Sequence, residues 1–89
     1  MTVAKGELIH TFAAPMTDET GRSWRAQVFG NPAGNVWFGW IVFTDDGGAS
    51  LWTGVETSQP DRDALRYWAT GIEPIYLEGA FARARGVAV

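Results

Sequence analysis

The sequence predicts an α+β fold, a four-stranded antiparallel β-meander followed by two C-terminal helices packed on one face (ββββαα). Gly and Pro recur at short intervals through residues 6–57, as they do between the strands of a meander. After residue 57 the apolar residues recur at helical spacing instead. The chain has 89 residues, 46% of them apolar, which suits one domain with one core. We therefore expect a single domain over residues 1–89, with a sheet at 6–57, a helical part at 58–85 and a tail at 86–89.

Two strands are expected in the first third of the chain. The first, at 6–13, alternates moderately, and the turn-forming residues 16–21 follow it. The second, at 22–29, alternates Trp24, Ala26 and Val28 with polar residues.

Two turns frame the third strand, which is expected at 35–44. The segment 31–34, Asn-Pro-Ala-Gly, predicts the turn that precedes it. Asp45-Asp46-Gly47-Gly48 predicts a tight hairpin after it, because Asp-Gly supplies the positive φ that such a turn needs. The fourth strand is then expected at 49–57.

The helical part begins with a recognisable start signal. Ser58 is the expected N-cap, with Pro60 in the first turn and Asp61 three residues after the cap. Gly71 is expected to end this helix as a C′ residue, and Glu73-Pro74 begins a second helix that runs to about residue 83. The tail either stays free or adds a short edge strand.

The third strand is apolar on both sides, so both faces of the sheet call for cover. The expected turns place Gly30 opposite Asn35 and Thr44 opposite Ala49, and residues opposite each other share a face. Predicted face one contains Arg25, Gln27, Phe29, Val36, Phe38, Trp40, Val42, Leu51, Thr53 and Val55. Predicted face two contains Trp24, Ala26, Val28, Trp37, Gly39, Ile41, Phe43, Trp52 and Gly54.

The helices are expected on predicted face two, which is almost purely apolar. There Gly39 and Gly54 lie side by side and leave a trough for a helix or an indole ring. On predicted face one, Arg25 lies opposite Trp40 as a cation–π pair. An uncovered face of this kind is larger than monomers usually expose. A second copy, another protein, the C-terminal tail or a ligand is therefore expected to cover it.

The leading hypothesis is a non-enzymatic module that forms a homodimer, or binds another protein, through this surplus face. The expected interaction residues are Arg25, Gln27, Phe29, Phe38, Trp40, Leu51 and Thr53. Single-stranded nucleic-acid binding by Phe38, Trp40 and Arg25 is an alternative, and a ligand-binding or enzymatic cleft between sheet and helices is another. We expect no catalytic residue, metal or cofactor.

The chemically reactive residue types offer little for catalysis. His10 is the only histidine and there is no cysteine, so His10 has no thiol to activate and no second histidine with which to share a metal. Asp45 and Asp46 are first of all turn residues. A carboxylate cluster near the helix starts would have to come from Glu56, Glu73 and Glu78.

Aromatic and basic residues of the helical part suggest two further groups. Tyr67, Trp68 and Tyr76 are expected to gather near the turn between the helices, with Trp68 in the core. Arg83 and Arg85 complement the dipole at the end of the second helix.

The charge and the apolar runs indicate a cytoplasmic protein without a membrane partner. The net charge is −3, which is not the basic footprint of a general nucleic-acid binder. The first residues lack the apolar core of a signal peptide, and the longest apolar run, VWFGWIVF, is too short to span a membrane.

The order of elements over residues 6–70 resembles that of Whirly and PUR-type single-strand-binding domains. The passage from strands into a capped helix also resembles HicB-like antitoxin domains. The first resemblance implies a sheet surface with aromatic and basic groups, often in a dimer. This chain departs from it by its few basic strand residues and its acidic charge.

Overall fold

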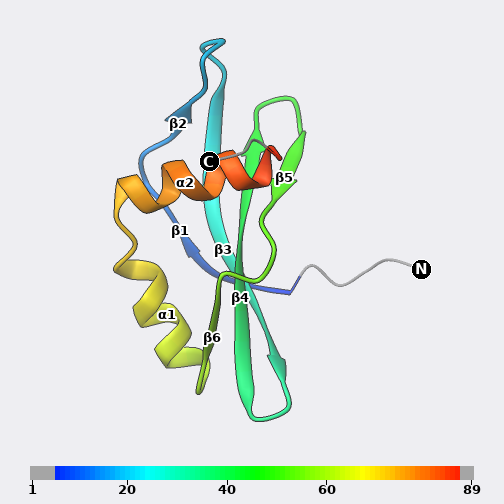
Figure 1. Cartoon of the computed structure of the whole chain (residues 1–89), viewed down its shortest axis with the longest axis vertical. Helices are drawn as coiled ribbons and strands as arrows, with labels where there is room; N and C mark the ends of the chain where they lie inside the picture. Colours follow the sequence, from blue (N-terminus) through cyan, green and yellow to red (C-terminus); the bar gives the residue numbers. More distant parts are fainter. Residues whose placement is uncertain (1–5, 87–89) are drawn as a thin grey trace, which may run out of the picture.

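A computed structural model describes residues 6–86 as an antiparallel six-stranded sheet with two helices after it (Figure 1). The strands are β1 (Glu7–Thr11), β2 (Met16–Thr17), β3 (Ser23–Ala33), β4 (Val36–Asp45), β5 (Ser50–Trp52) and β6 (Thr57–Gln59). The helices are α1 (Arg62–Thr70) and α2 (Pro74–Ala84). The order β1-β3-β4-β5 is that of a meander, while β2 pairs with β3 and β6 pairs with β4. The predicted α+β class, an antiparallel sheet followed by two C-terminal helices, is thus confirmed, whereas the sheet has six strands and not the four of the predicted meander.

The two outer strands of the predicted meander are each interrupted. Residues 16–21, predicted as a turn, begin with β2, and Met16 pairs with Trp24 before the chain turns. Pro15 immediately before β2 has no N–H to give to a ladder, so the outer strand breaks there. On the other side, the predicted strand 49–57 is split into β5 and β6 by residues 53–56.

The β3–β4 hairpin is longer than predicted. The strands continue to the pair Ala33 and Val36, and Gly34 makes the turn with a φ of 64°. The predicted turn at 31–34 and the pairing of Gly30 with Asn35 are therefore wrong, since Gly30 pairs with Gly39. The pairing moves by an even number of residues, so the predicted faces of β3 and β4 hold.

The β4–β5 hairpin differs from the prediction by one residue. Thr44 pairs with Ser50 rather than with Ala49. The cause is a three-residue loop in which Gly48 has a φ of 87°. Asp45 N donates a backbone hydrogen bond to the Ala49 carbonyl, and the Asp45 carbonyl accepts one from Gly48 N. The Asp45 carboxylate also accepts a hydrogen bond from Ala49 N at 2.8 Å and fixes this loop.

That single residue exchanges the two faces of β5. Leu51 pairs with Phe43, and Trp52 pairs with Val42. Leu51 and Thr53 therefore lie on the side opposite to the predicted one, and Trp52 takes the place predicted for them.

The core lies between the two helices and one face of β3 and β4. This is predicted face two, on which the sequence predicts the helices. The buried strand residues are Ile9, Trp24, Ala26, Val28, Ile41 and Phe43. The buried helix residues are Leu65, Ala69, Leu77, Ala80 and Phe81. We call this side of the sheet the helical face. In Figure 1, α2 crosses the sheet, and its packing is against β4 and β5.

A pair of glycines receives α1, but it is not the predicted pair. Gly39 pairs with Thr57, not with Gly54, and its other neighbour is Gly30. A Cβ atom on Gly39 would lie 2.5 Å from Cδ1 of Leu65. The trough between the two glycines is therefore filled by a side chain of α1, in agreement with the expectation that such a trough receives a helix.

The helix ends differ slightly from the prediction. Ser58 lies in β6, and Asp61 is the N-cap of α1, where its carboxylate accepts a hydrogen bond from Ala64 N at 2.8 Å. Gly71 ends α1 as predicted, but as the C-cap with a φ of −92° and not as a C′ residue. Pro74 opens α2 as predicted.

Within residues 6–86 no helix is long and apolar enough to cross a membrane. The question of a strand in the tail concerns residues 87–89, which lie outside the described residues.

Candidate interaction face

The side of the sheet turned away from the core, here called the open face, carries no helix of residues 6–86 (Figure 1). By their pairing, its members include Leu8, Thr11, Arg25, Gln27, Phe29, Asn31, Ala33, Val36, Phe38, Trp40, Val42, Thr44, Ser50, Trp52 and Ser58. One half of this face is aromatic and aliphatic, and the other half is polar.

Two indole rings dominate the apolar half. Trp40 and Trp52 stack with their ring centroids 6.3 Å apart and an interplanar angle of 17°. Gly6 allows the Trp40 ring to lie against the chain, because a Cβ atom on Gly6 would lie 2.7 Å from its Cη2. Phe29 and Val42 are buried although they belong to this face. The stacked rings thus form the centre of the apolar half.

Large apolar side chains around this centre remain in contact with solvent. Leu8 is 46% exposed, Phe38 38% and Trp52 44%. The three come from β1, β4 and β5, so the exposed apolar surface extends across the width of the sheet. Because large exposed apolar side chains on one face are what an interaction site offers, the open face is the candidate interaction surface.

The indole nitrogen of Trp40 adds a polar requirement to this surface. Trp40 Nε1 is buried and has no hydrogen-bond partner within the described part of the chain. An indole N–H that is buried normally finds an acceptor. The apolar half therefore contains one buried donor that the described residues leave without an acceptor.

The polar half is hollowed. By pairing, Arg25 is its single charged member, while Asp45 and Asp46 of the β4–β5 hairpin also line the hollow. Gln27 donates a hydrogen bond from Nε2 to Thr11 Oγ1 at 3.2 Å. Arg25 is exposed, and the described residues offer it no ion pair. A depression of about 500 Å³ lies between Arg25, Gln27 and Asp45. Arg25 pairs with Thr44, so the predicted stacking of Arg25 on Trp40 is wrong.

Five of the seven predicted interaction residues lie on the open face, and two do not. Leu51 and Thr53 are turned to the helical side by the one-residue difference in the β4–β5 hairpin. Thr53 is 8% exposed, and its hydroxyl accepts a hydrogen bond from Ile41 N at 3.0 Å and donates one to the Gly54 carbonyl at 2.7 Å. The large exposed side chains of this face that the sequence prediction missed are Trp52 and Leu8.

The three glutamates predicted as a carboxylate cluster are separate. The Glu56 carboxylate accepts hydrogen bonds from the Tyr76 hydroxyl and from Arg83, both at 2.5 Å. Glu73 and Glu78 line different hollows. No group of three His, Cys, Asp or Glu side chains in residues 6–86 could hold a metal ion.

The Glu56 contact fastens α2 to the end of the sheet. Burial, together with the hydrogen bond to Glu56, raises the pKa of Tyr76 to about 12. The phenol therefore stays neutral and donates to Glu56, while the Arg83 guanidinium stacks 5.6 Å from the Tyr76 ring.

His10 and the acidic turn have structural contacts. The His10 ring meets Phe12 edge to face at a centroid distance of 4.7 Å and lines none of the hollows of residues 6–86 described here. Asp45 bonds to Ala49 and pairs with Arg22 at 3.3 Å, as a turn residue does.

The aromatic group predicted at the interhelical turn is partly formed. Trp68 and Tyr76 meet edge to face at 6.0 Å, and Trp68 packs against the core while remaining only partly buried. Tyr67 is 84% exposed, and together with Trp68 and Tyr76 it lines a shallow hollow at the interhelical turn.

Comparison with family models, curated proteins and solved structures gives no match.

Proposed function

We propose that this protein is a non-enzymatic interaction module that forms a homodimer by packing its open face against the open face of a second copy. The observation that carries this proposal is a sheet face with exposed aromatic side chains around a stacked Trp pair and one charged member, Arg25. Enrichment in aromatic residues and depletion of charge mark the centre of protein interfaces.

The dimensions of the open face suit such an interface. β3 has 11 residues, which at about 3.3 Å per residue gives a length of roughly 36 Å. Strands about 4.8 Å apart give a width of roughly 15–19 Å across the four positions of the meander. The resulting footprint of roughly 500–700 Å² approaches the ~800 Å² per partner of a standard interface.

A second copy of the chain suits this face because the face can complement itself. In a two-fold interface each residue meets the partner's copy of another residue or of itself. An axis near Trp40 and Trp52 brings apolar half onto apolar half, and the two Arg25 side chains then lie at opposite ends. The two Arg25 charges do not meet in that arrangement, so the open face needs no counter-charge from a different partner.

Nucleic acid is less well supported as an occupant. Single-stranded nucleic acid binds to stacking platforms that lie beside a positively charged groove. The stacked indoles could supply the platform, but Arg25 is the only basic member of the open face as described. This alternative is therefore kept as an outcome of the test below.

The mass of the protein in solution tests the proposal. The chain has a mass of 9.7 kDa, and light scattering after size-exclusion chromatography is expected to give twice that value. Trp52→Glu is expected to give the monomer, because the substitution places a charge on the 44% exposed ring position. Ile75→Glu is the matched control, since Ile75 is 75% exposed on α2, and it is expected to leave the dimer intact.

Two results would contradict the homodimer. One is a wild-type monomer at every concentration up to the solubility limit. The other is an equal effect of Trp52→Glu and Ile75→Glu on the mass, with both variants folded by circular dichroism. If a monomer shows quenching of Trp fluorescence by a single-stranded oligonucleotide at low salt, and Trp52→Glu abolishes it, the nucleic-acid alternative replaces the homodimer.

A further inference from the structure

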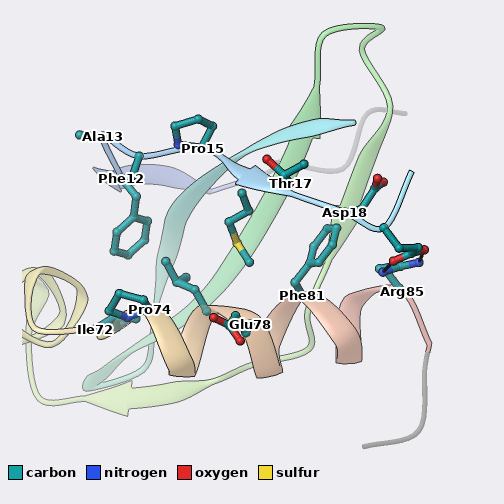
Figure 2. Close-up of a pocket in the computed structure, with 14 residues that line it drawn as sticks. Phe12, Ala13, Pro15, Thr17, Asp18, Ile72, Pro74, Glu78, Phe81 and Arg85 are labelled. Carbon is teal, nitrogen blue, oxygen red and sulfur yellow. Dashed lines mark hydrogen bonds and ion pairs between the residues drawn. The ribbon is translucent and has the colours of Figure 1, made fainter. Parts of the chain in front are cut away.

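A slot lies on the helical side of the domain, away from the open face. Figure 2 shows its two walls, the segment from Phe12 to Glu19 on one side and α2 on the other. Its volume is about 520 Å³, within the range of pockets that hold small organic molecules. Its apolar lining includes Phe12, Met16, Ile72, Leu77 and Phe81.

The slot follows from how α2 is attached to the rest of the fold. α2 packs against β4 and β5, whereas the segment from Phe12 to Glu19 runs along the opposite border of the sheet. β2 contributes only two residues there, and Pro15 keeps the preceding chain from joining the ladder. The helix and the outer strand therefore stand apart, and apolar core side chains form the bottom of the space between them.

Two polar contacts hold the walls at this separation. Arg85 at the end of α2 forms a two-pronged ion pair with Glu19, one of whose bonds measures 2.9 Å. The Asp18 carboxylate accepts hydrogen bonds from the Thr20 hydroxyl at 2.6 Å and the Trp24 indole at 3.0 Å. The rim of the slot is thus tied both to α2 and to β3, so the space is preformed.

The charge around the slot is negative. Three carboxylates line it, Asp18, Glu19 and Glu78, against one cation, Arg85. Hydrogen bonds from the Thr20 hydroxyl and then from the Trp24 indole hold the pKa of Asp18 well below its usual range, and a hydrogen bond from Arg85 lowers that of Glu19. Arg85 is already engaged by Glu19. Glu78 is exposed and makes no hydrogen bond or ion pair within residues 6–86.

We propose that this slot binds a small organic cation, with an aromatic or aliphatic body between Phe12 and Phe81 and a protonated amine at Glu78. The apolar bottom accommodates the body, and the unpaired carboxylate supplies the counter-charge. A carboxylate or phosphate ligand would have to displace Glu19 from Arg85 and would meet Glu78 with the same sign of charge. This inference is independent of the homodimer, because none of these residues lies on the open face.

Three probes with one body and different charge test the proposal: phenylpropylamine, phenylpropanol and phenylpropionate. Binding to the ¹⁵N-labelled full chain is followed by amide chemical shifts. For a ligand of about ten non-hydrogen atoms we expect a Kd of about 1 mM for the amine. The amine is expected to bind more tightly than the alcohol, the acid least tightly, and the shifts to centre on residues 12–19 and 72–85.

Three variants locate the site and its charge. Glu78→Gln is expected to weaken binding of the amine about two- to fivefold, the range of an ion pair near the surface, and to leave the alcohol unchanged. Glu73→Gln removes the same charge just before α2, outside the slot, and is expected to leave both affinities unchanged. Ala14→Phe adds a ring at an exposed position that lines only the slot, and is expected to abolish binding of both probes.

Several results would overturn the proposal. The absence of saturable shifts up to about 10 mM amine would show that the slot takes no such ligand. Equal affinity for amine and acid, or tighter binding of the acid, would exclude a cation site. Shifts that Ala14→Phe leaves intact, in a variant with a wild-type melting curve, would place the binding elsewhere.

Discussion

Leu65 of α1 and Gly39 of β4 are in direct contact across the interface of helix and sheet. A Cβ atom on Gly39 would lie 2.5 Å from Cδ1 of Leu65 and 3.1 Å from Cγ2 of Thr57. Gly30, the partner of Gly39 in the ladder, is equally close to Leu65. Both glycines and Leu65 are buried, so these contacts set how closely α1 approaches the sheet.

Gly39→Ala is therefore expected to destabilise the fold by about 1–3 kcal/mol, the cost of forcing an extra methyl group into a packed core. Loss of chain entropy in the unfolded state offsets this by only about 0.4–1 kcal/mol. Chemical denaturation measures the difference. Gly54→Ala is the matched control, because a Cβ atom there meets nothing within 4 Å, and we expect a change within about 0.5 kcal/mol. Equal effects of the two substitutions would show that α1 does not rest on Gly39.

The buried hydroxyl of Thr53 gives a second prediction. It is the hydrogen-bond acceptor for Ile41 N, in the gap of β4 between its last pair with β5 and its first pair with β6. Thr53→Val keeps the volume and leaves that N–H without an acceptor, so we expect a loss of about 1–3 kcal/mol in denaturant unfolding. Thr53→Ser keeps the hydroxyl and is expected to lose less. A larger loss for Ser than for Val would show that the methyl group matters more than the hydrogen bond.

The Asp18 carboxylate gives a prediction about pH. Hydrogen bonds from Thr20 and Trp24 lower its pKa in the folded state, so its contribution to stability is fully present above the unfolded value of about 4 and is lost as the pH falls below it. Asp18→Asn cannot accept the Trp24 bond with its amide NH₂ group. We expect wild type to melt above this variant at pH 7, and the gap to narrow below about pH 4. Asp46→Asn, in an exposed turn, is the control, and a gap independent of pH would contradict the assignment.

Tyr76 gives the corresponding prediction at alkaline pH. Its pKa is raised to about 12 by burial and by the hydrogen bond to Glu56, so the neutral phenol stabilises the fold below the unfolded value of about 10, and this stability is lost as the pH rises toward 12. Absorbance of the phenolate in a Tyr67→Phe background isolates Tyr76, since the chain has two tyrosines. Adding Glu56→Gln is expected to lower the midpoint. An unchanged midpoint would show that Glu56 does not act on this phenol.

The sequence predicted the faces of β3 and β4 correctly because a period of two tolerates an error of an even number of residues. The misplaced β3–β4 turn moved every pair but left Phe29 and Trp40 on the same side. The sequence could not reveal how far the β3–β4 hairpin extends, since Pro32 is typical of a turn although it lies within β3.

The β4–β5 register could not be predicted, because two turns fit the sequence Asp-Asp-Gly-Gly. The choice depends on whether Gly47 or Gly48 takes the positive φ, and the Asp45 carboxylate favours the longer loop by bonding to Ala49. That one residue decided that Trp52, and not Leu51 or Thr53, belongs to the candidate face. The sequence left a cleft between sheet and helices as an alternative, but it could not name the residues of the slot beside α2, since their placement involves a tertiary ion pair between Glu19 and Arg85.

Pro32 has a consequence for how copies of this chain can associate. β1 pairs with β3 only from Gln27 to Gly30, so beyond Gly30 the outer border of β3 has no neighbour within the described residues. A bare border of this kind is a template on which further strands add and sheets grow into aggregates. Proline removes a donor from that border, and proteins use it in this way to block such growth. Pro32 thus disfavours the addition of a further strand at this border of the sheet, whereas the open face stays available for association of copies.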